Sequence, residues 1–261
     1  MKKQNEEDKE KQKTMHKNEK KTILFAILIF GVFLVSILLF SKIFLSADPS
    51  GIDDIVSVWN ETKNTTSAAM FNISGGYIAA LNLTASVQNT HWKAFVGWVN
   101  GAFTLDDFSG STIYDWSLSV TTGRVYTTRD SSTIEWNLIQ CANGTTNLAA
   151  ENTAMFHNRT ADNITATFTY PGTHDPFWVA GRPINSNACP TLNTYINDVS
   201  QDDDFEEMAL YDSTSIIYAT ILEDNLVGYD GQPYDFQMLV PENGSQGFTG
   251  ATPYYLYVEL D

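Results

Sequence analysis

The chain has 261 residues and a formal net charge of −16, and 43% of its residues are hydrophobic. Because this length and hydrophobic content suffice for a buried core, they exclude an intrinsically disordered chain. Residues 49–261 hold 25 acidic against six basic side chains, and since that charge would repel phosphates, the composition excludes a nucleic-acid partner.

The first 46 residues divide into a charged segment and an apolar one. Residues 1–21 hold eight Lys against five acidic side chains, and ILFAILIFGVFLVSILLF at 23–40 has 18 residues without a charge. An apolar run of this length crosses a bilayer as a helix, and the positive-inside rule leaves its Lys-rich side in the cytoplasm. We therefore expect a cytoplasmic tail at 1–21, a single-pass transmembrane signal-anchor helix at 22–46 in the cell membrane, and an extracellular C-terminal domain.

Two other interpretations compete with a signal anchor. Cleavage after Ala47 would make the segment a secretory signal peptide, but its apolar stretch is longer than such peptides usually have, and Leu45 is large for its place near the cleavage site. A pilin-type leader would carry an early Glu, which this apolar run lacks. We favour the anchor and leave cleavage open.

Residues 47–70 are expected to form a stalk or linker. Ser50 and Asp53 are spaced as a helix capping box, and the apolar residues from Ile52 to Trp59 fall on one helical face. This pattern predicts a short helix, with an irregular linker as the alternative.

From residue 71 to residue 261 the sequence consists of short β-branched and aromatic runs separated by Gly, Asn, Asp and Pro. Such runs are typical of antiparallel strands and predict a mainly β ectodomain with a β-sandwich or jelly-roll architecture. A loop-like stretch at 141–163 leaves open a division into two packed modules. The expected strands are 76–87, 91–98, 101–106, 111–120, 123–129, 133–139, 163–170, 176–180, 214–223, 234–240 and 253–260.

The chain has two cysteines, Cys141 and Cys189. Outside the cytosol they would form a disulfide that closes a loop of about 49 residues and stabilises the fold by about 4 kcal/mol. Two buried free thiols are the alternative.

Eight Asn residues stand two positions before a Ser or Thr without an intervening Pro, about twice the number that the composition gives by chance. Such triplets accept N-glycans outside the cytosol. In the strand expected from Tyr77 to Val87, Leu81 and Leu83 share an apolar face, so Asn82 points the other way. We predict covalent N-glycans, with ordinary turn and strand roles for Asn and Thr as the alternative, at Asn60, Asn64, Asn72, Asn82, Asn143, Asn158, Asn163 and Asn243.

An acidic run at 201–207 supplies the carboxylate oxygens that Ca²⁺ prefers. The candidate calcium ligands are Asp202, Asp203, Asp204 and Glu206, although the run lacks the Gly of an EF-hand loop. A solvated acidic loop is the alternative.

Catalytic motifs are not found in the exported part of the sequence. His91, His157 and His174 are far apart, and there is no HExxH and no GxSxG, so neither a zinc site nor a serine triad is predicted. Paired carboxylates for glycoside hydrolysis stay open because acids are abundant. A sugar-stacking surface of Trp and Tyr also stays open, although alternation in strands places most of them in the core.

Three stretches resemble a recurring ectodomain of archaeal cell-surface proteins: GAFTLDDFSGSTIYDWSLSVTTGRVYTTR at 101–129, ILEDNLVGYDGQPYDFQMLVPENG at 221–244, and YYLYVEL at 254–260. The resemblance extends from about Gly97 to Asp261. It implies a membrane-anchored, N-glycosylated protein with a β-rich ectodomain in the cell envelope, and it carries no known activity and no functional residue.

Together these features predict a non-enzymatic, membrane-anchored cell-surface glycoprotein with a structural, adhesive or envelope-assembly role. The expected partners are the membrane and either other envelope proteins or further copies of the chain. The alternatives are an anchored carbohydrate- or calcium-dependent binding module and an anchored glycan-processing enzyme.

Overall fold

The structure, a computed structural model, describes residues 48–56, 59–118 and 121–261. The expected cytoplasmic tail and signal anchor lie outside these residues. Within the described ranges, no helix is long and apolar enough to cross a membrane. The described part is mainly β, as the sequence predicts, and its strand pairs are antiparallel.

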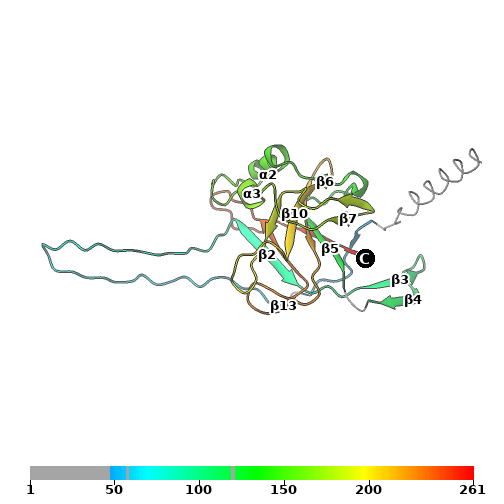
Figure 1. The fold of residues 1–261 in the computed structure, drawn as a ribbon, viewed down its shortest axis with the longest axis horizontal. Helices are drawn as coiled ribbons and strands as arrows, with labels where there is room; N and C mark the ends of the chain where they lie inside the picture. The colour runs from blue at the N-terminus through cyan, green and yellow to red at the C-terminus, as the bar shows by residue number, and fades with distance from the viewer. Residues whose placement is uncertain (1–47, 57–58, 119–120) are drawn as a thin grey trace, which may run out of the picture. The chain divides into compact units, whose positions relative to one another are not determined.

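A seven-stranded sheet forms the centre of the fold (Figure 1). Its strands follow the order β1–β15–β5–β11–β10–β6, and β9 pairs with β10 beside β6. The strands are β1 (Ser50–Gly51), β5 (Gly123–Thr128), β6 (Gln140–Cys141), β9 (Thr191–Asn193), β10 (Glu206–Tyr211), β11 (Ile216–Ile221) and β15 (Tyr255–Leu260).

Side chains of this sheet alternate between two hydrophobic cores, one on each face. On β11, Ile216 and Tyr218 belong to the first core, whereas Ile217 and Ala219 belong to the second. This is the period of two that a strand imposes. Because both faces are covered, the central strands β5, β10 and β11 are buried almost throughout, and their polar side chains, such as Arg124 and Glu207, are buried with the apolar ones.

Different elements cover the two faces. Met238 and Val240 of β14 are fully buried in the first core, together with Leu148 and Ile164 of the short helices. The second core takes side chains from Trp136 and from β7 and β8. The covering elements are β2 (Trp92–Gly97), β14 (Phe236–Pro241), the π-helix η2 (Gly144–Leu148), α2 (Ala149–Ala154) and α3 (Ile164–Thr167) on the first face, and the 3-10 helix η1 (Trp136–Leu138), β7 (Phe177–Val179) and β8 (Arg182–Ile184) on the second.

The predicted disulfide is confirmed, since Cys141 and Cys189 are bonded to each other. Cys141 ends β6 and Cys189 lies two residues before β9, and both strands pair with β10. The disulfide therefore joins two segments, distant in sequence, that share one edge of the central sheet. Its loop spans 48 positions, a length for which chain entropy gives a stabilisation of about 4 kcal/mol.

Three smaller features lie outside the two cores. The hairpin of β3 (Ala102–Asp106) and β4 (Thr112–Ser117) is exposed at every residue. A second short ladder joins β12 (Leu226–Val227) and β13 (Pro233–Tyr234). Residues 59–90 contain no helix or strand, and all are exposed; in Figure 1 they form the long cyan trace.

Three expected strands are wrong. Residues 76–87 form no strand, because no described segment pairs with their backbone. Residues 133–139 contain the 3-10 helix η1 instead. Residues 163–170 contain α3, which begins where the Asn163 side chain accepts a hydrogen bond from the Ala166 N–H at 2.7 Å, a capping interaction that favours a helix.

The short helix expected in the stalk is not formed in its described residues. Ser50 and Gly51 pair with Val258 and Tyr257 of β15 instead. Ser50, the residue expected to cap a helix, therefore lies in an edge strand of the central sheet. Residues 52–56 and 59–70 contain neither helix nor strand, which agrees with the irregular-linker alternative.

Candidate functional site

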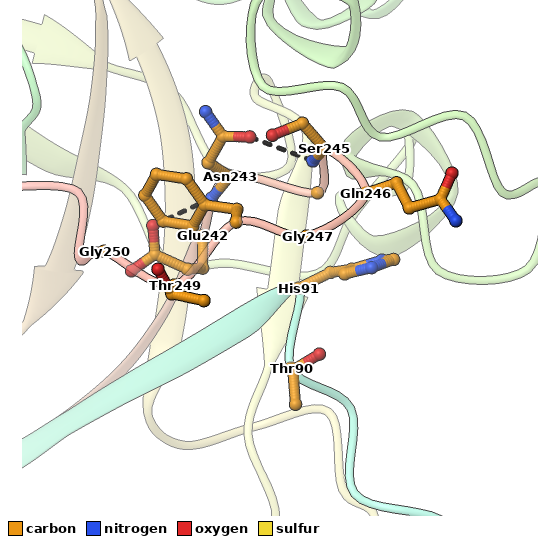
Figure 2. Close-up of a pocket in the computed structure, with 11 residues that line it drawn as sticks. Thr90, His91, Glu242, Asn243, Ser245, Gln246, Gly247, Thr249 and Gly250 are labelled. Carbon is orange, nitrogen blue, oxygen red and sulfur yellow. Dashed lines mark hydrogen bonds between the residues drawn. The ribbon is translucent and has the colours of Figure 1, made fainter.

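A polar pocket of about 350 Å³ lies where β2 begins and β14 ends (Figure 2). Thr90 and His91 line one side, and Glu242 with the loop at 243–250 lines the other. The volume is at the lower end of the range for small-molecule sites. The antiparallel register of β2 and β14, which places Trp92 opposite Pro241, brings these two distant segments together.

Turn residues give the 243–250 loop its shape. The Asn243 side chain accepts a hydrogen bond from the Ser245 N–H at 2.9 Å, an Asx-turn. A Cβ on Gly244 would lie 2.7 Å from the Phe156 carbonyl oxygen, and Gly247 has a φ of +77°. Only glycine fits the close approach at 244 and readily adopts the backbone at 247.

The carboxylate of Glu242 is ionised and is held in the pocket wall by hydrogen bonds. Its carboxylate accepts hydrogen bonds from Lys93 Nζ at 2.8 Å, from the Thr252 N–H at 2.9 Å and from the Asn243 N–H at 2.8 Å. Burial acts to raise the pKa of Glu242, but these hydrogen bonds outweigh it and the pKa is lowered. A carboxylate held in this way is a poor general acid.

His91 lines this pocket, and His157 lies next to His91. The rings of His91 and His157 are 5.8 Å apart between centroids, and His91 Nδ1 lies 3.8 Å from Asp162 Oδ2. His157 is buried, and its Nε2 lies 2.8 Å from the Glu242 carbonyl oxygen. Because a carbonyl only accepts, Nε2 carries the proton, and the buried Nδ1 has no hydrogen-bond partner among residues 48–56, 59–118 and 121–261.

The expected calcium ligands do not share one environment. Asp202 and Asp203 are exposed, whereas Glu206 is 5% exposed and accepts the Asp175 N–H with both oxygens, at 2.9 and 3.0 Å. Burial, with the negative charges of Asp175, Glu223 and Asp203, raises the pKa of Glu206 to about 7. Among the described residues, no group of three or more His, Cys, Asp or Glu is placed to hold a metal ion.

The eight glycan acceptors are accessible to different extents. Six are exposed, and Asn163 and Asn243 are partly buried. At Asn143, Asn163 and Asn243 the side-chain oxygen accepts a backbone N–H. This leaves the amide nitrogen, the atom that carries an N-glycan, outside those hydrogen bonds.

An aromatic cluster missed by the sequence reasoning lies near β13. The ring centroid of Trp98 lies 5.9 Å from that of Trp59 and 5.4 Å from that of Tyr234, and Tyr229 stacks on Tyr234 at 6.1 Å. Trp59 and Trp98 are 37% and 43% exposed. The Trp and Tyr content was a general signal, but only tertiary structure brings residues 59, 98 and 229 together.

The remaining histidine, His174, has a structural position. It is buried, and its Nε2 accepts the Cys189 N–H at 3.0 Å. In the described part of the chain, no Ser or Thr hydroxyl hydrogen-bonds to a His ring.

Comparison of the chain with protein-family models, curated proteins and solved structures found no match.

Proposed function

We propose that the protein is a membrane-anchored cell-surface glycoprotein with a β-sandwich-like ectodomain and a structural, adhesive or envelope-assembly role, without catalytic activity. The observation that carries the proposal is the Cys141–Cys189 disulfide within the fold. Disulfides persist in oxidising compartments and are rare in the cytosol. This supports export of residues 47–261, in agreement with the Lys-rich tail and apolar run that precede them.

The positions of the glycan acceptors support the same proposal. All eight Asn residues are at least partly accessible, so their modification does not require the cores to open. Asn243 lines the pocket, and a glycan attached there would begin at the pocket wall. The pocket is then better suited to seat the protein's own sugar than to process a foreign one.

Mass spectrometry of glycopeptides from the native, membrane-extracted protein tests this function. We expect sugars on most of the eight acceptors, and we expect Thr84→Ala to remove the sugar at Asn82 while leaving that Asn in place. Ser86→Ala, which lies outside any acceptor triplet, is the matched control. Unmodified Asn at all eight positions, in protein recovered from the soluble cytoplasmic fraction, would overturn the proposal.

A carbohydrate-binding module is the second candidate, and the exposed Trp59–Trp98 pair favours it, because sugars stack on exposed aromatic rings. Calorimetry with a glycan panel, with and without Ca²⁺, measures such binding. Trp98→Ala should abolish the heat, whereas Trp178→Ala, which is 41% exposed and lies on β7, should leave it unchanged. No heat with any glycan would exclude this candidate.

A further inference from the structure

The β3–β4 hairpin presents an apolar face to solvent. Phe103 lies opposite Trp116 and Leu105 opposite Tyr114, so the four side chains share one face. Their exposed fractions are 43%, 50%, 56% and 60%, in that order. Neither strand pairs with a third one among the described residues. A two-stranded hairpin alone is marginally stable in water, and a third strand usually supplies the missing stability.

The segment from Tyr77 to Val87 has the sequence pattern of a strand but no paired strand among the described residues. Its alternating residues Tyr77, Leu81, Leu83 and Val87 are 75%, 55%, 84% and 88% exposed. The sequence has the period of a strand, yet the segment pairs with no other part of the described chain. The Tyr77 N–H donates to the Ser74 carbonyl oxygen at 3.3 Å, and the backbone N–H and C=O groups that follow are available to a strand edge.

Charge favours another copy of the same chain as the partner of this segment. Residues 64–90 contain no Asp, Glu, Lys or Arg, although the chain as a whole carries −16. Acidic copies repel one another, and an uncharged strand is the part of the chain that approaches a second acidic copy at the least electrostatic cost. Uncharged, β-patterned segments without Pro are also those that pair most readily between chains.

We propose that Tyr77–Val87 of one copy adds as a third strand to a free edge of the β3–β4 hairpin of a second copy. This inference rests on the envelope-assembly role proposed above and names its partner. Strand addition uses backbone hydrogen bonds for affinity and the alternating side chains for specificity. On such a strand Asn82 faces away from Leu81 and Leu83, so a glycan there projects from the face opposite the apolar one.

The proposed contact is directional. Donor and acceptor are different surfaces, so each copy that donates its segment still has its own hairpin free. A head-to-tail contact of this kind continues from copy to copy, closing into a ring or extending as a filament.

Photo-crosslinking of the full-length protein in its native membrane tests strand addition. Two forms with different affinity tags are coexpressed, and only one carries benzoyl-phenylalanine in place of Leu83. Irradiation should yield a product that bears both tags, and peptide mapping should place the cross-link between residues 102 and 117 of the second copy.

Proline substitutions supply the specificity control. Leu81→Pro removes a backbone donor from the segment and should reduce the two-tag product by about tenfold or more. Ala68→Pro is the matched control, because Ala68 is also exposed but lies outside the alternating stretch, and it should leave the yield unchanged. Both positions are outside the cores, so neither variant should prevent folding.

Strand addition and the proposed function would be contradicted by different results. Absence of the two-tag product, attachment outside the hairpin, or full yield with Leu81→Pro would each overturn strand addition. If the same preparation is glycosylated and membrane-bound, the proposed function survives that result. Unglycosylated cytoplasmic protein would instead overturn the proposed function.

Discussion

Tyr126 on β5 donates a hydrogen bond to Glu259 on the neighbouring strand β15, with 2.5 Å between Oη and Oε2. Glu259 Oε2 also lies 3.3 Å from Arg124 Nη2, and Glu259 Oε1 accepts the Ala180 N–H at 3.0 Å. Tyr126, Arg124 and Glu259 are all buried. This network connects the sheet to the segment after β7 and satisfies a carboxylate that would otherwise be costly to bury.

Removal of the buried carboxylate should be strongly destabilising. Glu259→Ala leaves the buried Arg124 with Asp261 as its remaining acidic partner, and we expect a loss of about 3 kcal/mol in the free energy of unfolding. Asp261→Asn is the control: the Asp261 side chain is half-exposed, so its loss should be about 1 kcal/mol or less. Urea unfolding followed by tryptophan fluorescence measures both, and equal losses would contradict this assignment.

The stability of the fold should depend on pH through Glu206. Its pKa is raised to about 7 in the folded state from an ordinary value of 4.5. The neutral carboxyl therefore contributes stability that is fully present below about pH 4.5 and is lost as the pH rises through 7. Burial also raises the pKa of Glu207, which acts in the same direction.

Thermal unfolding between pH 5 and pH 8 measures this dependence. The melting temperature should fall as the pH rises, and Glu206→Gln, which keeps an oxygen for the Asp175 N–H, should flatten the curve. Glu61→Gln, at an exposed position, should leave the slope as it is. A wild-type melting temperature that increases steadily from pH 5 to pH 8 would rule out this role for Glu206.

The disulfide should be a major contributor to stability. Replacement of both Cys141 and Cys189 by Ser removes the bond that joins β6 to the segment before β9, and we expect a loss of about 4 kcal/mol in the free energy of unfolding. The wild-type protein unfolded with and without a reducing agent provides an independent measure of the same quantity. A double variant as stable as the wild type would show that β6 and β9 stay paired with β10 without the bond.

Gly123 should not tolerate a side chain. Its φ is +144°, and an added Cβ would lie 1.9 Å from the Glu259 carbonyl oxygen on β15. Gly123→Ala should therefore destabilise the fold by about 2 kcal/mol or more. Gly75→Ala is the control, since nothing lies within 4 Å of its added Cβ. Comparable melting temperatures for the two variants would refute the close approach of β5 and β15.

Sequence patterns predict strands best where local alternation and tertiary pairing agree. The runs at 91–98 and 253–260 became β2 and β15 with little change in bounds. The run at 76–87 alternates as clearly, but it has no paired strand in the described part of the chain, and a local pattern does not reveal whether a partner exists. β10 escaped prediction because Glu206 and Glu207 resemble a solvated acidic loop, whereas the structure buries both and gives them the Asp175 and Leu239 N–H groups.

The candidate site was less predictable than the fold. Asn243 was singled out as a glycan acceptor, but the contact of its loop with His91 spans about 150 positions and follows from the register of β2 and β14. The disulfide was easier to predict than the calcium ligands, because the chain has two cysteines and they can form one pair. The environment of Glu206 depends on Asp175 and Glu223, which only the folded chain brings near.

Protease treatment of intact cells, with tags at both ends of the full-length protein, tests whether the β-rich domain is exported. We expect loss of the C-terminal tag while the N-terminal tag stays protected until the cells are opened. A C-terminal tag that resists protease on intact cells, yet is digested after lysis, would contradict the surface location on which the proposed function depends.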